Sequence, residues 1–280
     1  MGLVTTAPAP WCVPRDSCWE LGPRDMLASG RRVVRRVGGG GAHEVFLVAG
    51  ESHRLAVAKL PRPHLADDPH CLLGLKHEAH ALEQLAQPTV PRHLDTVLSG
   101  PHPHLLLEYV PGPTLDDALA TRKPLSPQAV AGLGWSLACT LEHIAAAGWV
   151  HLDVKPSNIV LSARPTLLDF ELAMPAGEAA RLRRPTGTWA FMPPEQRAAG
   201  FADAPAIGPP ADVFALAASL GEALVGRPLT HTRRSGLPGR VGAVLEEALA
   251  QEPSDRPTAA ELAAGLAEHA EPHAPLAAAA

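Results

Sequence analysis

One segment of this chain combines a carboxylate, a cation and an amide at close spacing: His151-Leu152-Asp153-Val154-Lys155-Pro156-Ser157-Asn158. Asn158 is the only asparagine in the 280 residues, and Lys155 is one of only four lysines. Phosphoryl transfer needs a carboxylate that orients the attacking hydroxyl, a cation near the moving phosphate, and oxygen ligands for Mg²⁺. The sequence therefore predicts this chemistry, with Asp153 and Lys155 as catalytic residues and Asn158 as a metal ligand.

The composition excludes several other classes of protein. Hydrophobic residues make up 46% of the chain, which excludes wholesale disorder. The 24 basic and 29 acidic residues give a net charge of −5, so we expect no nucleic-acid partner. Four cysteines form no disulfide framework, and the first twenty residues lack the apolar stretch of a secretory signal. We therefore expect a cytoplasmic protein with free thiols.

The hydrophobic pattern changes along the chain. Its first half predicts one helix over residues 72–85 and strands over 33–37, 45–48, 55–60, 94–98 and 105–109. Its second half predicts helices over residues 127–147, 211–225, 241–250 and 258–269. Strands followed by helices indicate an α+β fold with two lobes and a hinge near residues 110–112.

The most apolar window, residues 131–150, has about the length of a membrane span. Glu142 and His143 interrupt this window, so it predicts a buried core helix, and we expect no membrane span.

The segment 151–158 resembles the catalytic loop of protein kinases, and the resemblance extends from about Arg32 to Leu266. It implies the bilobal protein-kinase fold, with a small, mainly β N-lobe that carries one helix and a larger, mainly helical C-lobe. On this basis we expect a Pro-rich N-terminal tail over residues 1–30, a kinase domain over 31–270 and a low-complexity tail over 271–280. Within the domain, the N-lobe covers about 31–109 and the C-lobe about 113–270.

The resemblance implies ATP as the co-substrate. Ala56-Val57-Ala58-Lys59 resembles the third-strand lysine motif, in which Lys59 holds the α- and β-phosphates and Glu78 pairs with it. The run Gly38-Gly39-Gly40-Gly41 also fits a linker, but its distance from Lys59 favours a phosphate-binding loop in which Gly38 and Gly40 match the family. The remaining positions matched to the nucleotide are Val45, Val57 and Val160 around the adenine ring, and Glu108 and Val110 at the hinge.

The resemblance also implies a metal site and an activation segment. Asp169, in Asp169-Phe170-Glu171, matches the residue that binds Mg²⁺ together with Asn158. Glu171 replaces a glycine and adds a carboxylate near the metal, which extends the expectation to Mn²⁺. The residues matched to the activation segment and its supports are Thr186, Thr188, Glu195, Asp212 and Arg256. Among these, Asp212 is expected to brace the backbone of the catalytic loop, and Arg256 to pair with Glu195.

The chain departs from the family pattern at several positions. Leu152 replaces an arginine that pairs with a phosphorylated activation loop, so we expect activity that does not require phosphorylation of Thr186. His43 replaces the third glycine of the glycine-rich loop. The region after Gly226 is short, which leaves the mode of substrate docking open.

The resemblance, with Lys155 two residues after Asp153, implies a serine/threonine protein kinase that phosphorylates protein hydroxyls. The departures support a first alternative, a pseudokinase that binds nucleotide and regulates a partner. A second alternative is a small-molecule phosphotransferase, because such enzymes share the His-x-Asp and Asn spacing. Catalytic turnover and the choice of acceptor distinguish these hypotheses. We expect Trp11 and Trp19 to pack back on the domain, whereas an exposed pair would make the N-terminal tail a candidate site for a regulatory protein.

Overall fold

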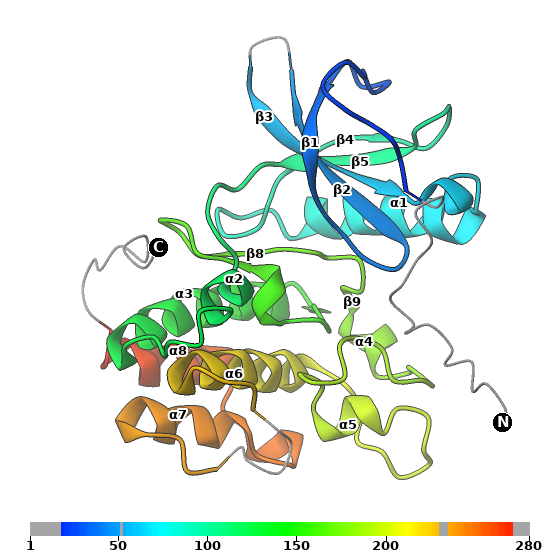
Figure 1. Ribbon diagram of the computed structural model, residues 1–280. Coiled ribbons are helices and arrows are strands. Elements are labelled where there is room, and N and C mark those ends of the chain that lie inside the picture. Colours follow the sequence, from blue (N-terminus) through cyan, green and yellow to red (C-terminus); the bar gives the residue numbers. More distant parts are fainter. Residues whose placement is uncertain (1–17, 51–52, 230–234, 271–280) are drawn as a thin grey trace, which may run out of the picture. The chain divides into compact units, whose positions relative to one another are not determined.

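The first unit of the chain is built on an antiparallel sheet of five strands in the order β1-β2-β3-β5-β4 (Figure 1). The computed structural model describes residues 18–50, 53–229 and 235–270, and this unit comprises the described residues up to 79 together with 92–109. Each predicted strand is present within two residues of its expected ends. The strands are β1 Arg32–Gly39, β2 His43–Ala49, β3 Leu55–Pro61, β4 His93–Val97 and β5 His104–Glu108, and the short helix η2, Pro63–Leu65, follows β3.

The register of the sheet sorts the side chains of β2 and β3 onto two faces. Val45 lies opposite Lys59, and Leu47 lies opposite Val57, so these four side chains share one face. The residues between them point to the other face, where most of them join a buried apolar cluster. This cluster contains Leu27, Val33, Phe46, Val48, Ala56, Ala58, Leu60 and Leu106.

Trp19 ties the segment before β1 to this cluster. Its side chain packs against the cluster, and its indole Nε1 donates a hydrogen bond of 2.7 Å to the Pro61 carbonyl. Its backbone N–H donates to the Glu44 carboxylate at 2.7 Å. Trp19 therefore anchors the chain at the start of the described residues, whereas Trp11 lies outside them.

The helix predicted over residues 72–85 is α1, Pro69–Gln84. Residues 80–91, which include its C-terminal end, belong to the second unit, so the division between the units differs from an N-lobe that covers all of 31–109. Thr89 gives the physical reason. Its hydroxyl shares a hydrogen bond of 2.7 Å with the Thr140 hydroxyl, and its carbonyl accepts one of 3.0 Å from the Leu167 N–H.

The second unit comprises the described residues of 80–91 and 110–270; it is mainly helical, and α3 (Pro127–Ala146) forms its core. The Ser126 side chain caps the start of α3 by accepting from the Ala129 N–H, and Pro127 occupies the first turn. The buried face of α3 packs against α6 (Pro209–Val225) and α8 (Ala259–Ala267). By length and composition alone α3 could cross a membrane, but half of its most apolar stretch is buried inside the protein, as expected of a core helix.

The other elements of the second unit are short or peripheral and position the loops described below. They are α2 Leu115–Leu119, β6 Trp149–Val150, η3 Pro156–Asn158, β7 Ile159–Val160, β8 Thr166–Leu167, β9 Met174–Pro175, α4 Ala176–Ala179, α5 Pro194–Arg197, α7 Gly239–Ala248 and η4 Pro253–Asp255. A five-stranded sheet in one unit and helices in the other confirm the predicted α+β organisation.

Candidate active site

The segment 151–158 forms a loop between β6 and η3 that is braced by the Asp212 side chain. The backbone N–H of His151 donates to Asp212 Oδ2 at 2.6 Å, and that of Leu152 donates to Oδ1 at 2.8 Å. Leu152 has a φ of +67°, which is costly for a residue with a branched side chain. The two hydrogen bonds hold this conformation. Complete burial raises the pKa of the Asp212 carboxyl above its ordinary value, while the charge of His151 and the two amide hydrogen bonds oppose the shift.

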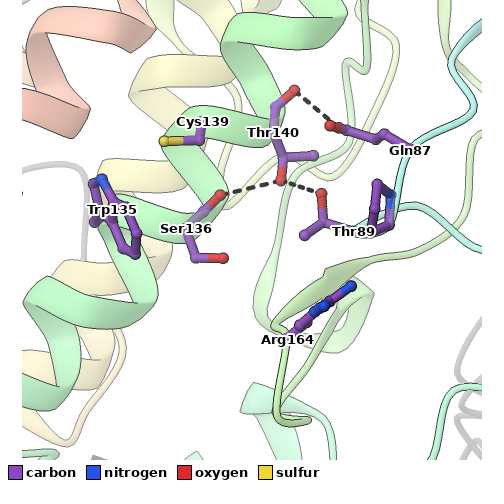
Figure 2. Close-up of a pocket in the computed structure, with 8 residues that line it drawn as sticks. Gln87, Thr89, Trp135, Ser136, Cys139, Thr140 and Arg164 are labelled. Atoms are coloured by element: carbon purple, nitrogen blue, oxygen red, sulfur yellow. Dashed lines mark hydrogen bonds between the residues drawn. The ribbon is translucent and has the colours of Figure 1, made fainter. Parts of the chain in front are cut away.

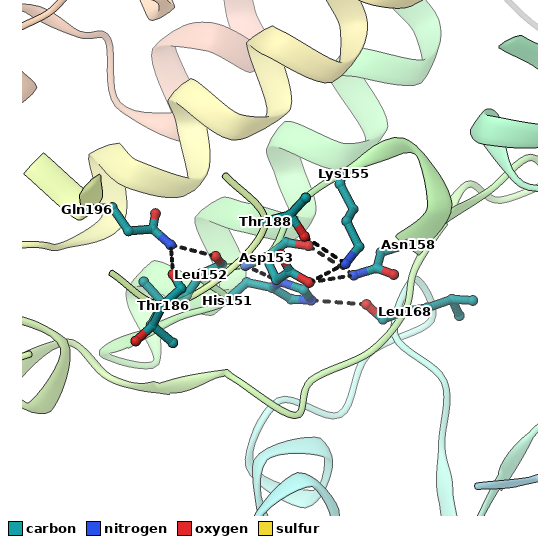
Figure 3. A network of polar contacts seen from close by, with 9 residues as sticks. All are labelled: His151, Leu152, Asp153, Lys155, Asn158, Leu168, Thr186, Thr188 and Gln196. Atoms are coloured by element: carbon teal, nitrogen blue, oxygen red, sulfur yellow. Dashed lines mark hydrogen bonds and ion pairs between the residues drawn. The ribbon is translucent and has the colours of Figure 1, made fainter. Parts of the chain in front are cut away.

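The two oxygens of the Asp153 carboxylate have different environments (Figure 3). Oδ2 accepts a hydrogen bond from Lys155 Nζ at 2.6 Å. Lys155 Nζ also donates to the Thr188 hydroxyl at 2.9 Å, and the Asn158 amide nitrogen donates to the Asp153 carbonyl at 2.9 Å. Oδ1 is buried and has no hydrogen-bond partner among the residues that the structure describes. A carboxylate with one oxygen fixed and the other without a partner keeps the capacity to accept a hydrogen bond from a hydroxyl group.

The segment after β8, which carries Asp169, is tied to the same loop. The Leu168 N–H donates to the Asn158 carbonyl at 2.7 Å, and the His151 ring nitrogen Nε2 lies 3.1 Å from the Leu168 carbonyl. Asp169 follows with a φ of +63°, and the buried Phe170 ring lies edge-on to His151 with centroids 4.7 Å apart. These contacts connect the backbone before Asp169 to that of Asn158.

The donor atoms of Asn158 and Asp169 fit a hard divalent cation. The amide nitrogen of Asn158 is used by Asp153, so its amide oxygen is the atom left to bind a cation. Asp169 supplies carboxylate oxygens, and oxygen donors are what Mg²⁺ prefers. Val160, the apolar residue matched to the adenine ring, is buried in β7, which pairs with β8.

In the first unit, Lys59 forms an ion pair with Glu78. Lys59 Nζ lies 2.7 Å from Glu78 Oε2, and both side chains are buried. The contact joins β3 to α1. Val45 and Val57 lie on the same face of the sheet as Lys59, and both are partly buried.

The glycine run pairs with β2 at its start and is held by Arg62 at Gly40. Gly38 lies opposite Val45, and Gly39 ends the pairing of β1 opposite Glu44. The Gly40 carbonyl accepts hydrogen bonds from Arg62 Nε at 3.0 Å and Nη2 at 2.8 Å. Arg62 was not among the predicted residues, because nothing in the sequence connects it to this turn.

Glu108 is the last residue of β5. Its N–H donates to the Arg92 carbonyl at 2.9 Å, and its carboxylate lies 3.0 Å from Arg92 Nε. Val110, the other hinge position, is the first residue of the second unit after β5.

Comparison with known proteins agrees with this geometry. The protein kinase domain model matches residues 31–240, three quarters of the chain. The chain belongs to the protein kinase family. Protein kinases use ATP with a divalent metal ion and act on protein substrates, and the bilobal kinase fold accounts for the sheet of the first unit and the helices of the second.

Similar curated proteins are bacterial kinases. The chain is 33% identical over 253 residues to the probable serine/threonine-protein kinase PkwA of Thermomonospora curvata, covering 84% of this chain and 33% of PkwA. It is 30% identical over 268 residues to the serine/threonine-protein kinase AfsK of Streptomyces coelicolor, covering 89% of this chain and 32% of AfsK. It is 31% identical over 262 residues to the serine/threonine-protein kinase PknB of Mycobacterium tuberculosis, covering 82% of this chain and 41% of PknB. The matched region therefore spans about a third to two fifths of these relatives.

In this member of the family, Gln196 connects the activation segment (residues 169–195) to the catalytic loop. Gln196 Nε2 donates to the Leu152 carbonyl at 2.8 Å and also to the Thr186 carbonyl (Figure 3). Gly187 lies in this contact with a φ of +116°, and a Cβ added there would approach the Leu152 carbonyl oxygen to 2.5 Å. Sequence reasoning missed Gln196, because its role depends on two carbonyls that meet only in the folded chain.

Leu152 lies in an apolar cluster that joins the catalytic loop to the activation segment. It is only 3% exposed. The cluster contains Val150, Leu152, Ala179, Ala199, Ile207 and Ala211, with Leu172, Met174, Ala176 and Leu182 packed against it. Apolar packing therefore fills the position where an arginine of other kinases pairs with a phosphate.

The end of the activation segment is fixed by a buried, bidentate ion pair. Arg256 Nη1 and Nη2 lie 2.7 and 2.9 Å from the two carboxylate oxygens of Glu195. Arg256 also donates to the carbonyls of Ala250, Pro210 and Gln251, at 2.8, 3.0 and 3.0 Å. Each nitrogen of the guanidinium is thus hydrogen-bonded, as a buried charge requires.

A pocket of about 300 Å³ lies elsewhere on the second unit (Figure 2). It is lined by residues before β4, by residues of α3 and by the turn between β7 and β8. Its lining residues are Gln87, Pro88, Thr89, Trp135, Ser136, Cys139, Thr140 and Arg164. This lining contains none of the predicted site residues, so the pocket is separate from the catalytic loop.

Proposed function

We propose that this chain is a serine/threonine protein kinase that transfers the γ-phosphate of ATP to protein hydroxyls. The observation that carries the proposal is the Asp153 carboxylate, in which Lys155 fixes Oδ2 while the buried Oδ1 lacks a partner among the described residues. The names of the bacterial relatives support serine and threonine as acceptors.

In the proposed mechanism, the substrate hydroxyl donates a hydrogen bond to Asp153 Oδ1. This contact orients the hydroxyl oxygen for in-line attack on the γ-phosphorus. As the new P–O bond forms and the bond to ADP breaks, the hydroxyl proton passes to Asp153. Lys155 stabilises the negative charge on the transferred phosphate, and Thr188 helps to position its ammonium group.

We assign nucleotide binding to the residues matched by the family motif. Lys59, positioned by Glu78, binds the α- and β-phosphates, and the backbone of the turn around Gly38 and Gly40 covers the phosphates. The Arg62 contacts to the Gly40 carbonyl support this assignment, because they restrict the turn to one conformation.

Asn158 and Asp169 would hold Mg²⁺, and the acidic Glu171 extends the proposal to Mn²⁺. When bound, the metal ion neutralises phosphate charge.

We further propose that the kinase acts in the cytoplasm and that a regulatory protein contacts it through the N-terminal segment. Three described cysteines, Cys18, Cys71 and Cys139, are free thiols, which is typical of a reducing compartment. Cys18 and Trp19 support the second proposal. The Cys18 sulfur accepts a hydrogen bond from Arg62, which also binds the turn at Gly40. A partner that displaces this segment would therefore act on the glycine-rich turn.

The experiment that tests the proposed function measures transfer of labelled γ-phosphate from ATP, with Mg²⁺ and Mn²⁺ in separate reactions. The acceptors are the protein itself, generic acidic and basic proteins, and a panel of small hydroxyl compounds. Label on serine or threonine that disappears in Lys59→Met and in Asp153→Asn supports the kinase. ATP binding without any transfer would support the pseudokinase instead, and label found only on small compounds would support a small-molecule phosphotransferase.

A further inference from the structure

Two nitrogen atoms of Arg197, at the end of α5, have lost water without gaining hydrogen bonds, although the side chain as a whole is partly exposed. Its Nε and Nη2 atoms are buried, and neither has a hydrogen-bond partner in the described part of the chain. Burial lowers the pKa of Arg197 below its ordinary value, because the charged form has lost hydration. Buried charges in proteins are normally paired, as Arg256 is with Glu195. Among the described residues, no anion pairs with the Arg197 side chain.

Trp189 lies beside this unpaired guanidinium. The Arg197 Cζ atom lies over the Trp189 ring, 5.4 Å from its centroid, so the ring faces the cation but offers it no oxygen acceptor. The Trp189 side chain is 57% exposed, and Phe201, four residues after Arg197, is 74% exposed. Exposed aromatic side chains beside a desolvated arginine are typical of binding surfaces.

The charge around this pair favours an acidic ligand. Residues 181–201 include three further arginines, Arg181, Arg183 and Arg184, all exposed. The only acid in this stretch is Glu195, which is buried and bound to Arg256. The stretch is thus strongly positive in a chain whose net charge is −5, and such a patch attracts acidic partners.

The pair also lies close to the proposed catalytic residues. Trp189 directly follows Thr188, whose hydroxyl binds Lys155 at 2.9 Å. Arg197 directly follows Gln196, which binds the Leu152 carbonyl at 2.8 Å. An extended peptide advances about 3.3–3.6 Å per residue, so the four residues on either side of an acceptor at Asp153 cover about 13–14 Å.

We propose that Arg197 and Trp189 recognise a carboxylate side chain, Asp or Glu, that lies within about four residues of the serine or threonine to be phosphorylated. The inference rests on the proposed kinase function and names its substrate class as acidic protein segments. For this contact the partly exposed Arg197 side chain turns Nε and Nη2 outward, and the carboxylate accepts hydrogen bonds from both in the bidentate geometry that arginine favours. Trp189 packs against the apolar part of the bound segment.

A phosphate on Thr186 of the same chain is a less suitable anion for this site. The Thr186 hydroxyl donates to the Arg184 carbonyl at 3.2 Å, and the Thr186 carbonyl accepts from Gln196. Phosphorylation removes the first contact, and the second holds the Thr186 backbone within its own loop.

The test uses the full-length protein and peptides that carry one serine, with Glu or Gln at each of the four positions on either side. For the wild type, we expect kcat/KM to be about 10- to 100-fold higher for Glu than for Gln at one or two positions. In Arg197→Met this ratio falls to about one. Arg197→Lys retains the charge without the bidentate geometry and gives an intermediate ratio. Arg240→Met, which removes an exposed charge on α7, serves as the matched control and keeps the wild-type ratio.

Thermal unfolding separates recognition from a structural role of Arg197. Because Arg197→Met removes an unpaired buried charge, we expect its Tm to equal or exceed that of the wild type. A lower Tm together with an unchanged Glu-to-Gln ratio would identify Arg197 as a structural residue and overturn the proposal.

Peptide binding by fluorescence anisotropy, without ATP, distinguishes failure of this inference from failure of the proposed function. An active wild type that does not distinguish Glu from Gln peptides overturns the inference and leaves the kinase function intact. If no peptide is phosphorylated, the kinase function fails. Tighter binding of Glu peptides by the wild type than by Arg197→Met then supports the acid-binding site, and equal binding overturns it.

Discussion

Replacing Leu152 with Ala tests whether apolar packing holds the activation segment against the catalytic loop. The side chain is 3% exposed and lies in the cluster with Ala179 and Ile207. Three carbon atoms are lost, at about 0.8 kcal/mol for each buried carbon, which gives about 2.4 kcal/mol. The cavity adds to this, so we expect a loss of about 3–5 kcal/mol in the free energy of unfolding.

Urea denaturation of the wild type and Leu152→Ala measures this loss, with Leu73→Ala as the control. Leu73 lies on α1 and is 63% exposed, so its replacement should change the free energy of unfolding by less than about 0.5 kcal/mol. If Leu152→Ala were as harmless as Leu73→Ala, the apolar cluster would not anchor the segment. The same reasoning predicts that phosphatase-treated wild type keeps its transfer activity. Activity that returned only with phosphate on Thr186 would contradict it.

Three further predictions concern stability. Arg256→Met leaves Glu195 buried and unpaired, so we expect a loss of about 3–5 kcal/mol in urea denaturation, largely restored by adding Glu195→Gln; an equally unstable double variant would contradict this account. Burial lowers the pKa of His104 below 6.5, so the unfolded chain binds more protons than the folded chain below pH 6.5, and the free energy of unfolding falls as the pH drops. NMR titration of His104, with unfolding of the wild type and His104→Gln across pH 5–8, checks this; a His104 pKa above 6.5 would refute it. Thr258→Ala removes the cap of α8 at a cost of about 1 kcal/mol. In the wild type the backbone N–H of Thr258, and to a smaller extent its hydroxyl, lower the pKa of Glu261, so the variant, which loses only the hydroxyl, should raise this pKa part of the way; an unchanged Glu261 pKa by NMR would exclude the hydroxyl contact.

The elements that the sequence predicted are those with a long, regular pattern. The five strands and α1, α3, α6, α7 and α8 follow directly from alternating or helical spacing of apolar residues. The short helices α2, α4 and α5, of four or five residues, were not predicted, because a single turn carries no periodicity. Residues 80–91 fall in the second unit because Thr89 bonds with Thr140, a contact that no local pattern signals.

The residues of the candidate site that the sequence predicted are also those with a local sequence signal. Asp153, Lys155, Asn158 and Asp169 lie in short motifs whose spacing is itself the signal, and Lys59 and Glu78 meet because both lie on predictable elements.

The residues that sequence reasoning missed act through contacts that form only in the folded chain. Gln196 binds two backbone carbonyls, and Arg62 binds the Gly40 carbonyl. The sequence marked Leu152 only as the absence of an arginine, and the structure gives it a position in an apolar cluster.

The most direct test of the central claim is a single-turnover measurement on wild type and Asp153→Asn, with ATP affinity determined in parallel. Asp153 is proposed to orient the acceptor hydroxyl, so Asp153→Asn should bind ATP as the wild type does. The same variant should transfer the γ-phosphate at least about 100-fold more slowly, the scale of a positioned acid–base group. Transfer at the wild-type rate by Asp153→Asn would contradict the account.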